Sequence, residues 1–257
     1  MSQICTRGKG IHLKSVDSTN TNLKKLSASG KARFYDFVTA DTQTSGRGRL
    51  GRSFSSASGK GIYLSYLVNP KDATPEELSR ITAWGAVAVR DAIFEVCGVS
   101  VGIKWVNDLV KDGRKLCGIL TESVFDGGRV ASVVMGIGIN VNHSTEDFPE
   151  ELRGTACSIK QITRSDTDIR ALTLNVVKHL DTMNDCFPNN KKYYLDEYRK
   201  SCVVPGKKVR IIEKDVERIG TALGIDDNFG LEVLFDDGKR ETVTGGDVSV
   251  RGFYGYI

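Results

Sequence analysis

Cysteine is scarce in this sequence, and its spacing forms no pairs. The 257 residues include six cysteines, and no two of them form a C-x-x-C pair. This distribution predicts reduced thiols in a reducing compartment and excludes a disulfide framework or a zinc site built on cysteine pairs. We therefore expect a cytoplasmic protein, although the sequence leaves an organelle-targeting signal open. The cysteines are Cys5, Cys97, Cys117, Cys157, Cys186 and Cys202.

Long hydrophobic runs and a strong excess of one charge are also lacking. No apolar stretch approaches the roughly 20 residues of a membrane-spanning helix, and residues 1–10 contain no apolar core of a secretory signal. The 36 Lys and Arg against 32 Asp and Glu give a net charge of +4, which does not by itself indicate nucleic-acid binding. We expect no membrane association, and the mild positive charge suits a protein that binds phosphates or an acidic partner.

The order of the predicted elements favours an α+β fold with two domains. Strands and helices are mixed before residue 204, and only short strands follow the Val204-Pro205-Gly206 breaker. We therefore predict a larger domain in residues 1–204 and a small barrel in residues 205–257. Strands are predicted at 11–16, 37–40, 61–68, 101–105, 108–111, 115–124, 129–139, 208–212, 219–224, 231–235, 240–244 and 248–251, and helices at 19–29, 74–97, 167–186 and 191–201.

Residues 46–52, the Arg/Gly loop, read Gly-Arg-Gly-Arg-Leu-Gly-Arg. The run matches G-x-G-x-x-G, but no helical pattern follows it, so it is not a dinucleotide-binding fingerprint. Glycine lets the backbone approach an anion, and arginine grips carboxylate or phosphate oxygens in a bidentate way. We predict that residues 42–58 are disordered in the free protein and become ordered over an anionic ligand. Taken alone, the run is explained equally well as a solvated basic loop or an RNA-binding segment.

Two further segments place polar groups or glycines at strand positions. Lys104 closes a predicted strand just before a turn that contains Asn107 and Asp108, and such a turn can direct the lysine into a site. An edge lysine before an ordinary turn is the simpler interpretation of this segment alone. Residues 136–140, Gly-Ile-Gly-Ile-Asn, place two glycines on one face of a strand, which indicates close approach of a ligand or a tight packing contact.

Together and in this order, the three segments resemble those of the biotin protein ligase family. The family's lysine-tryptophan-proline-asparagine-aspartate motif corresponds to residues 104–108, its Arg/Gly loop to residues 46–52 and its glycine-rich strand to residues 136–140. The similarity extends over nearly the whole chain, through residues 18–20, Gln43 and the strand at 114–120. The resemblance implies a mixed β-sheet with packed helices, like the catalytic fold of class II aminoacyl-tRNA synthetases, and a C-terminal SH3-like barrel.

The resemblance also implies an activity and a set of site residues. Enzymes of this family use ATP and Mg²⁺ to convert biotin into biotinyl-5'-AMP, and they transfer biotin to a lysine of a biotin carboxyl carrier domain. Catalysis is assigned to Lys104 and Arg47 at the junction of carboxylate and phosphate, and Mg²⁺ is expected to be held mainly by phosphates. The residues expected to bind biotin are Ser18, Thr19, Asn20, Gln43, Arg47, Gly118 and Gly138, and those expected to bind the nucleotide are Arg49, Arg52, Phe54, Lys104, Asn107 and Asn140.

Two positions depart from the family's pattern. Val106 stands where the family usually has proline, which makes the turn before Asn107 less rigid. Phe54 stands near the position where an aromatic residue, often tryptophan, covers the adenine, and phenylalanine can still stack there.

Several alternatives stay open at this point. A lipoate protein ligase, which shares the fold and the adenylate chemistry, is the nearest alternative function, and an RNA-binding module is a more distant one. Some bacterial relatives carry an N-terminal helix-turn-helix, but only residues 1–10 precede the first predicted strand, so we expect no specific DNA binding. The sequence is compatible with either a monomer or a homodimer.

Overall fold

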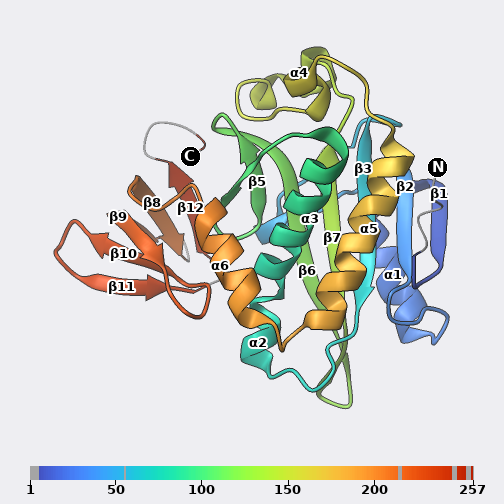
Figure 1. The fold of residues 1–257 in the computed structure, drawn as a ribbon, viewed down its shortest axis with the longest axis horizontal. Helices are drawn as coiled ribbons and strands as arrows, with labels where there is room; N and C mark the ends of the chain where they lie inside the picture. Colours follow the sequence, from blue (N-terminus) through green and yellow to red (C-terminus); the bar gives the residue numbers. More distant parts are fainter. Residues whose placement is uncertain (1–5, 55, 214–215, 245–247, 253–255, 257) are drawn as a thin grey trace.

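The computed structural model describes residues 6–54, 56–213, 216–244, 248–252 and 256. A seven-stranded sheet has the order β1-β2-β3-β7-β6-β5-β4, and a five-stranded sheet has the order β11-β10-β9-β8-β12 (Figure 1). The first sheet is mixed, because β1 pairs in parallel with β2 while its other ladders are antiparallel. Its strands are β1 Gly10–Val16, β2 Phe37–Gln43, β3 Gly61–Val68, β4 Gly102–Lys104, β5 Asp108–Lys111, β6 Arg114–Asp126 and β7 Arg129–Asn140.

Two tight turns set the register of the central strands. Asp112-Gly113, between β5 and β6, has φ values of 48° and 72°, and Gly127-Gly128, between β6 and β7, has values of 54° and 80°. Positive φ at both central residues is the two-residue hairpin geometry that Asp-Gly and Gly-Gly sequences favour. In the resulting β6–β7 ladder, Gly118 lies opposite Gly138.

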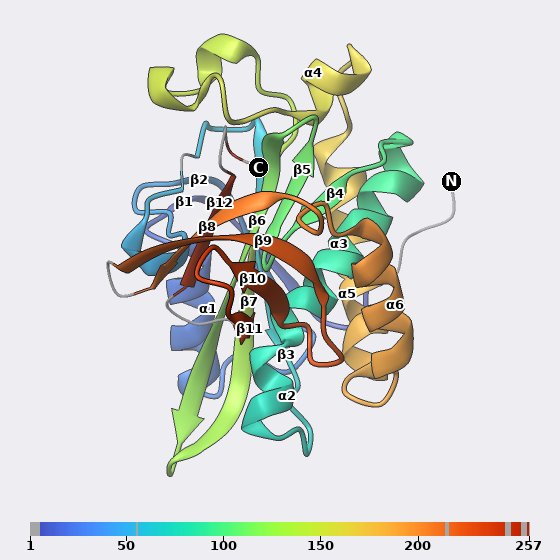
Figure 2. The same ribbon diagram turned by 90° about the vertical axis from the view of Figure 1, so that its left-hand side faces the viewer.

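Helices cover the two faces of the large sheet unequally. The long helices α3 (Ile81–Cys97) and α5 (Ile169–Cys186) lie on one face, and α1 (Thr19–Ala28) lies on the other (Figure 2). Most odd-numbered residues of β7, from 133 to 139, belong to the large core beneath α3 and α5. Val134, on the opposite face, packs in a smaller core beneath α1 with Leu23, Val38 and Leu67. Because side chains alternate along a strand, Gly136 and Gly138 share the α1 face with Val134.

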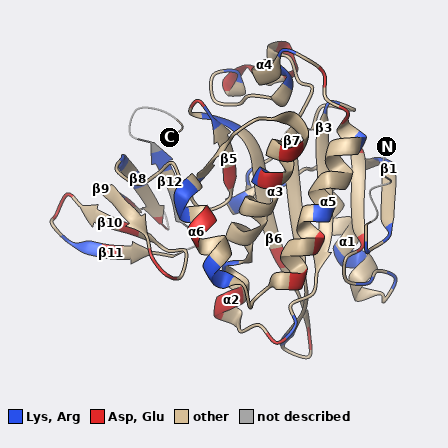
Figure 3. Ribbon diagram, viewed as in Figure 1, with Lys and Arg blue, Asp and Glu red and all other residues tan. Residues whose placement is uncertain are grey.

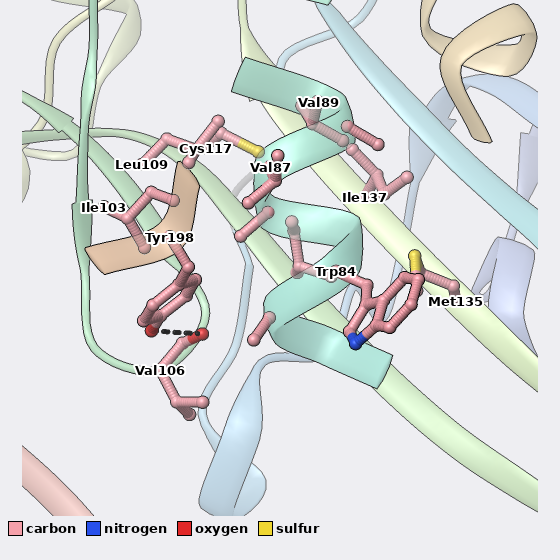
Figure 4. Packing of buried hydrophobic residues seen from close by; sticks show 14 of the residues in the cluster. Trp84, Val87, Val89, Ile103, Val106, Leu109, Cys117, Met135, Ile137 and Tyr198 are labelled. Carbon is pink, nitrogen blue, oxygen red and sulfur yellow. Dashed lines mark hydrogen bonds between the residues drawn. The ribbon is translucent and has the colours of Figure 1, made fainter. Parts of the chain in front are cut away.

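The large core extends beneath the segment that contains Lys104. Trp84 of α3 stacks on Tyr194 of α6 (Lys191–Ser201), with ring centroids 4.1 Å apart. The Tyr198 hydroxyl donates to the Val106 carbonyl at 3.3 Å (Figure 4). The turn after β4 is therefore held by a buried side chain of α6, although it has valine in place of proline.

The helices differ from the predicted ranges at a few ends. The helix predicted at 74–97 is broken at Arg80 into α2 (Pro75–Ser79) and α3. Its N-terminal capping box is formed by Thr74 and Glu77, as their spacing predicts. α5 begins at Ile169, because the Asp168 side chain caps it by accepting from the Ala171 N–H. Sequence reasoning missed α4 (Ile159–Thr163) and the short 3₁₀ turns Arg49–Gly51, Thr145–Asp147 and Glu150–Leu152.

The second sheet packs against the end of the first near β4. Its strands are β8 Lys208–Glu213, β9 Val216–Ile225, β10 Leu231–Phe235, β11 Arg240–Val243 and β12 Val248–Gly252. The indole N–H of Trp105 donates to the Phe229 carbonyl at 2.8 Å, and Arg199 donates to the Ile225 carbonyl at 2.9 Å. The predicted boundary between residues 204 and 205 falls between α6 and β8 and stays a prediction.

The cysteines of the described ranges form no disulfide bonds. The five cysteines within the described ranges are free, and Cys5 lies outside those ranges. Cys117 is fully buried in the large core, where burial raises the pKa of its thiol well above the ordinary value.

Among the described helices, none combines the length and the apolar character needed to cross a membrane.

The aromatic stack on α3 should contribute strongly to stability. Trp84→Ala is expected to lower the free energy of unfolding by about 3–5 kcal/mol, because it removes a large buried ring. Trp84 is 2% exposed, whereas Phe94 on the same helix is 58% exposed. Phe94→Ala is the matched control and should cost well under about 1 kcal/mol. Urea denaturation measures both values, and equal losses would contradict this account of the core.

Candidate functional site

Two adjoining cavities open on the α1 face of the large sheet. The larger has a volume of about 240 Å³ and lies between the Arg/Gly loop, the end of β4 and β12. The smaller has a volume of about 50 Å³ and lies between the start of α1 and strands β6 and β7. Both are lined by Arg49, Phe54, Asn107 and Lys115, among others, so the two cavities meet at these side chains.

The sequence-predicted site residues are distributed between these cavities as their expected ligands require. All seven residues expected to bind biotin line the smaller cavity, and all six expected to bind the nucleotide line the larger one. The first set comes from α1, β2, β6, β7 and the Arg/Gly loop, and the second set from the same loop and the ends of β4 and β7. The fold thus brings together segments that are more than 100 residues apart in sequence, as the pairing of Asn20 with Glu122 illustrates.

Glycines form the floor of the smaller cavity. A Cβ on Gly138 would lie 2.4 Å from Cζ of Phe54, and a Cβ on Gly136 would lie 2.3 Å from Oδ1 of Asn20. Contacts this short are not tolerated, so any larger residue would displace the aromatic ring or the start of α1. The two glycines therefore allow Phe54 and Asn20 to lie directly on the sheet.

Polar groups at the closed end of the smaller cavity have fixed orientations. Both the backbone N–H and the hydroxyl of Thr19 donate to Oε1 of Gln43, at 2.9 and 3.1 Å. Among the described residues, the amide nitrogen of Gln43 has only a long 3.4 Å contact with Ser56. Ser18 occupies the N-cap position of α1 but makes no side-chain capping hydrogen bond. The cavity therefore presents both donors and acceptors, and helix capping does not account for Ser18.

Asn20 is held by protein groups on both sides of its amide. Its Nδ2 donates to Glu122 at 2.8 Å, and its Oδ1 accepts from Ser65 at 2.5 Å. The Ser65 hydroxyl also lies 2.8 Å from the Thr19 hydroxyl, and Lys24 pairs with Glu122 at 2.5 Å. The Asn20 side chain thus orients the start of α1. Sequence reasoning missed Ser65 and Glu122, and the available signal was a polar residue within each of two largely apolar strands.

The Arg/Gly loop forms a compact turn in this structure. A bridge joins Arg47 to Ser53, and the Gly48 N–H donates to the Arg52 carbonyl at 2.6 Å. Leu50 has a φ of 57°, in the left-handed region, and this conformation reverses the chain. The guanidinium of Arg49 donates to Oδ1 of Asn107 at 3.2 Å. The loop is therefore connected to the turn after β4 across the junction of the two cavities.

Lys104 is a buried cation at the wall of the larger cavity. It is 3% exposed, and burial lowers its pKa to about 7, while Asp108 opposes this shift. The other charged groups that face it lower the pKa further: Arg251, Lys115 and Arg52. Asp108 is largely buried, with a side chain 13% exposed, and pairs with Lys115 at 2.7 Å. Cations therefore outnumber carboxylates at this wall, and an anion bound there would be stabilised.

Asn140 and Asn107 brace the cavity walls through backbone contacts. Asn140, at the end of β7, donates to the Cys157 carbonyl at 3.0 Å. Asn107 donates to the Ile119 carbonyl at 2.9 Å. Phe54 lies edge-on to Tyr63, with ring centroids 6.3 Å apart. The site combines a narrow polar-ended slot with a wider cationic cavity, and this shape suits a ligand whose small end is neutral and whose junction with a second group is anionic.

Comparisons with known proteins agree with this arrangement. The model of the biotin/lipoate A/B protein ligase family matches residues 12–140. The Bacillus subtilis bifunctional ligase/repressor BirA is 36% identical over 234 residues, which cover 88% of this chain and 69% of that protein. The Mycobacterium tuberculosis biotin–[acetyl-CoA-carboxylase] ligase is 30% identical over 237 residues, which cover 90% of this chain and 85% of that protein.

The same relationship holds in three dimensions. The structure of the Aquifex aeolicus biotin protein ligase in complex with biotin and ATP is similar to this chain, with a TM-score of 0.81 and 29% identity. The similarity covers 95% of this chain and 99% of that one. A Leishmania major biotin protein ligase, at 21% identity and a TM-score of 0.64, shares the fold. By its sequence and its fold, the chain is a member of the biotin protein ligase family, within the biotin/lipoate A/B protein ligases.

Proposed function

We propose that this protein activates biotin with ATP to biotinyl-5'-AMP and then transfers biotin to a lysine of a biotin carboxyl carrier domain. The observation that carries the proposal is the junction between the two cavities. A slot lined by oriented polar groups meets a cationic cavity at Arg49, Asn107 and Lys115. A molecule with a neutral head and an anionic end would place that end where the cations are.

The smaller cavity suits the ureido head of biotin. The head is neutral and needs a few directed hydrogen bonds within an otherwise apolar slot. Ser18, Thr19 and Gln43 provide hydroxyl and amide groups, and Gly118, Gly136 and Gly138 of β6 and β7 line the slot without side chains of their own. Arg47 lines the same slot and would meet the carboxylate of biotin.

The first chemical step joins two anions. An oxygen of the biotin carboxylate forms a bond to the α-phosphorus of ATP, and the bond from that phosphorus to the bridging oxygen breaks, so that pyrophosphate leaves with the electron pair. Lys104 and Arg47 would neutralise the carboxylate and the phosphate as they approach each other, and Arg49 and Arg52 would hold the other phosphates. Phe54 would stack on the adenine.

Mg²⁺ would be carried by phosphate oxygens. The described residues contain no group of three or more His, Cys, Asp or Glu arranged to hold a metal. Asp108, the carboxylate that lines the larger cavity, is already paired with Lys115. The residues present therefore suit a metal that enters with ATP and neutralises phosphate charge.

In the second step, the amine of the acceptor lysine attacks the carbonyl of biotinyl-5'-AMP. An amide bond forms, the bond between the carbonyl carbon and the phosphate oxygen breaks, and AMP leaves. The mixed anhydride is already reactive, so the step needs no covalent intermediate with the enzyme. Cys117, which lies within the strand at 114–120, is fully buried and would take no part.

The direct test is biotin-dependent exchange of labelled pyrophosphate into ATP. We expect exchange with biotin and little with lipoate, and transfer to a carrier domain that contains its target lysine. Exchange with lipoate alone would assign the chain to the lipoate ligases of the same family. Residues of both charges are found along α5 and α6 in Figure 3, and the net charge of the chain is only +4, which does not favour an RNA-binding module.

Removal of the Lys104 ammonium should nearly abolish adenylate formation. Lys104→Ala is expected to lower the rate of pyrophosphate exchange by about 10²–10³, the usual effect of losing one group that stabilises a developing charge. Lys192→Ala is the matched control, because Lys192 is 88% exposed on α6. A folded Lys104→Ala protein with exchange near the original rate would refute the assignment.

The hydroxyl of Ser65 should matter for biotin affinity more than for turnover. Ser65→Ala removes a buried hydroxyl that donates to Asn20 and lies 2.8 Å from the Thr19 hydroxyl, and we expect the KM for biotin to rise about 5- to 10-fold while kcat changes little. Ser29→Ala, at an exposed position at the end of α1, is the control. The idea fails if kcat falls and the KM for biotin stays constant.

Ligands should protect the Arg/Gly loop from proteolysis. Arg47, Arg49 and Arg52 would gain carboxylate and phosphate partners on binding, and the ordered loop would exclude water from the anhydride. Trypsin should cut the free protein first at these arginines, and biotin with ATP should slow those cleavages. Arg49→Gly should bind biotin more weakly and release biotinyl-5'-AMP, which would label bystander lysines. Equal cleavage rates with and without ligands would show that the loop is not a ligand-ordered lid.

A further inference from the structure

Tyr256, which follows β12, contacts the site through three different groups. Its backbone carbonyl accepts a hydrogen bond from Nζ of Lys104 at 2.7 Å. The same Nζ lies 3.5 Å from the centroid of the Tyr256 ring, within the range of a cation–π contact. The Tyr256 hydroxyl donates to Oδ2 of Asp108. One residue that follows the second sheet therefore touches both the proposed catalytic lysine and the carboxylate that pairs with Lys115.

Asp108 depends on Tyr256 for one of its two oxygens. Oδ1 of Asp108 pairs with Lys115 at 2.7 Å, and Oδ2 accepts from the Tyr256 hydroxyl. Although burial raises the pKa of Asp108, Lys115 and the hydroxyl hold it below its ordinary value. Burial and the nearby Asp108 raise the pKa of Tyr256, so its phenol keeps its proton and stays a donor at neutral pH. A largely buried carboxylate needs such partners to remain charged.

Tyr256 also shields the ammonium of Lys104 from solvent. The ring and the carbonyl of Tyr256 occupy part of the surface of an ammonium that is 3% exposed. An ammonium has three donors, and the carbonyl takes one of them, so donors remain for an anion in the larger cavity, which Tyr256 itself lines. The ring also excludes water from the ammonium, and a dry cation acts more strongly on a bound anion.

We propose that Tyr256 is a positioning residue of the adenylation site, which fixes Lys104 and Asp108 relative to each other and shields the lysine from water. The proposal rests on the function proposed above and deepens it. It gives a residue that follows the second sheet an indirect part in the first chemical step. Tyr256 need not touch the reacting atoms, because it acts through Lys104.

Substitutions that separate the ring from the hydroxyl test the proposal. Tyr256→Phe keeps the ring and loses the bond to Asp108, and Tyr256→Ala loses both. We expect kcat of biotin-dependent pyrophosphate exchange to fall about 10-fold or more in Tyr256→Ala. The fall in Tyr256→Phe should be smaller, because this variant loses the hydrogen bond to a charged group but keeps the ring. Tyr193→Phe on α6, where Tyr193 is 47% exposed, is the matched control and should leave exchange unchanged. Unchanged or increased exchange in Tyr256→Ala would overturn the proposal, and an increase would identify Tyr256 as an obstruction.

The pH profile distinguishes positioning from general support of the fold. Burial lowers the pKa of Lys104 to about 7, so kcat/KM for ATP should fall as pH rises through that value and the lysine loses its proton. In Tyr256→Ala, Lys104 becomes hydrated, its pKa rises, and the falling limb should move to higher pH. Asp108, Arg251, Lys115 and Arg52 face Lys104 in both proteins, and ATP titrates identically in both. A falling limb at the same pH in both proteins would refute the shielding role.

A double-mutant cycle isolates the hydroxyl bond. Asp108→Ala and Tyr256→Phe each remove one end of the bond, so their combined effect on kcat should be clearly smaller than the product of the two separate effects. Fully multiplicative effects would show that the two residues act independently.

A measurement without substrates keeps this proposal separate from the proposed function. Competitive acetylation with acetic anhydride across a pH series, followed by mass spectrometry, reports the reactivity of each lysine. Lys160, which is 42% exposed, serves as the internal standard. In the original protein, Lys104 should be acetylated slowly. In Tyr256→Ala, Lys104 should be acetylated faster, and the pH midpoint of its reactivity should be higher. If the original protein shows no biotin-dependent exchange, the proposed function fails, and the acetylation of Lys104 still decides whether Tyr256 shields it. Identical labelling in the two proteins would overturn the proposal.

Discussion

A buried ammonium with too little negative charge around it is the constraint on which this site depends. Lys104 is 3% exposed and has one carboxylate close by, which is itself shared with Lys115. Removing a charge from water costs several kcal/mol unless partners replace the hydration. The fold offsets this cost in part with a carbonyl and an aromatic ring from Tyr256. The negative charge that is still lacking around Lys104 would be supplied by a bound anion, and the ligands of the proposed reaction are anions.

The two faces of the large sheet have different roles: one packs the large core, and the other carries the candidate binding slot. On β7, alternate residues point either into the core beneath α3 and α5 or toward α1. On the α1 face, Val134 packs beneath the helix, whereas the lack of side chains at Gly136 and Gly138 lets Asn20 and Phe54 lie directly against the sheet. The binding slot is thus created by omitting side chains from one face of a strand whose other face is fully packed. The rigidity of the packed face keeps the slot open, because the sheet cannot collapse into it.

Much of the fold could be predicted from local sequence, and the limits have physical causes. Asp112-Gly113 and Gly127-Gly128 specified hairpins because their turns need positive φ, and the strands between them followed. The break at Arg80 was missed because the apolar pattern continues across it into α3. The compact turn in the Arg/Gly loop was missed because its bridge joins backbone groups, which leave no pattern in the sequence.

The same distinction applies to the site. The residues expected from the resemblance all line the two cavities, since they lie in short ordered motifs that can be recognised along the chain. Ser65, Glu122 and Tyr256 were not found, because each has meaning only through a partner far away in sequence. Tyr256 is 152 residues from Lys104 and 148 from Asp108, and neither periodicity nor composition marks such a pair.

The contacts that were missed share one property that the recognised motifs lack. They touch the groups expected to meet the ligands and fix how those groups point. Glu122 and Ser65 fix the amide of Asn20 from opposite sides, and Tyr256 and Lys115 do the same for the carboxylate of Asp108. A buried polar group with a partner on each side has one orientation and loses little entropy when a ligand arrives. Because mixed-anhydride formation depends on holding two repelling anions in line, such fixed orientations contribute to the rate even where the residue never meets the substrate.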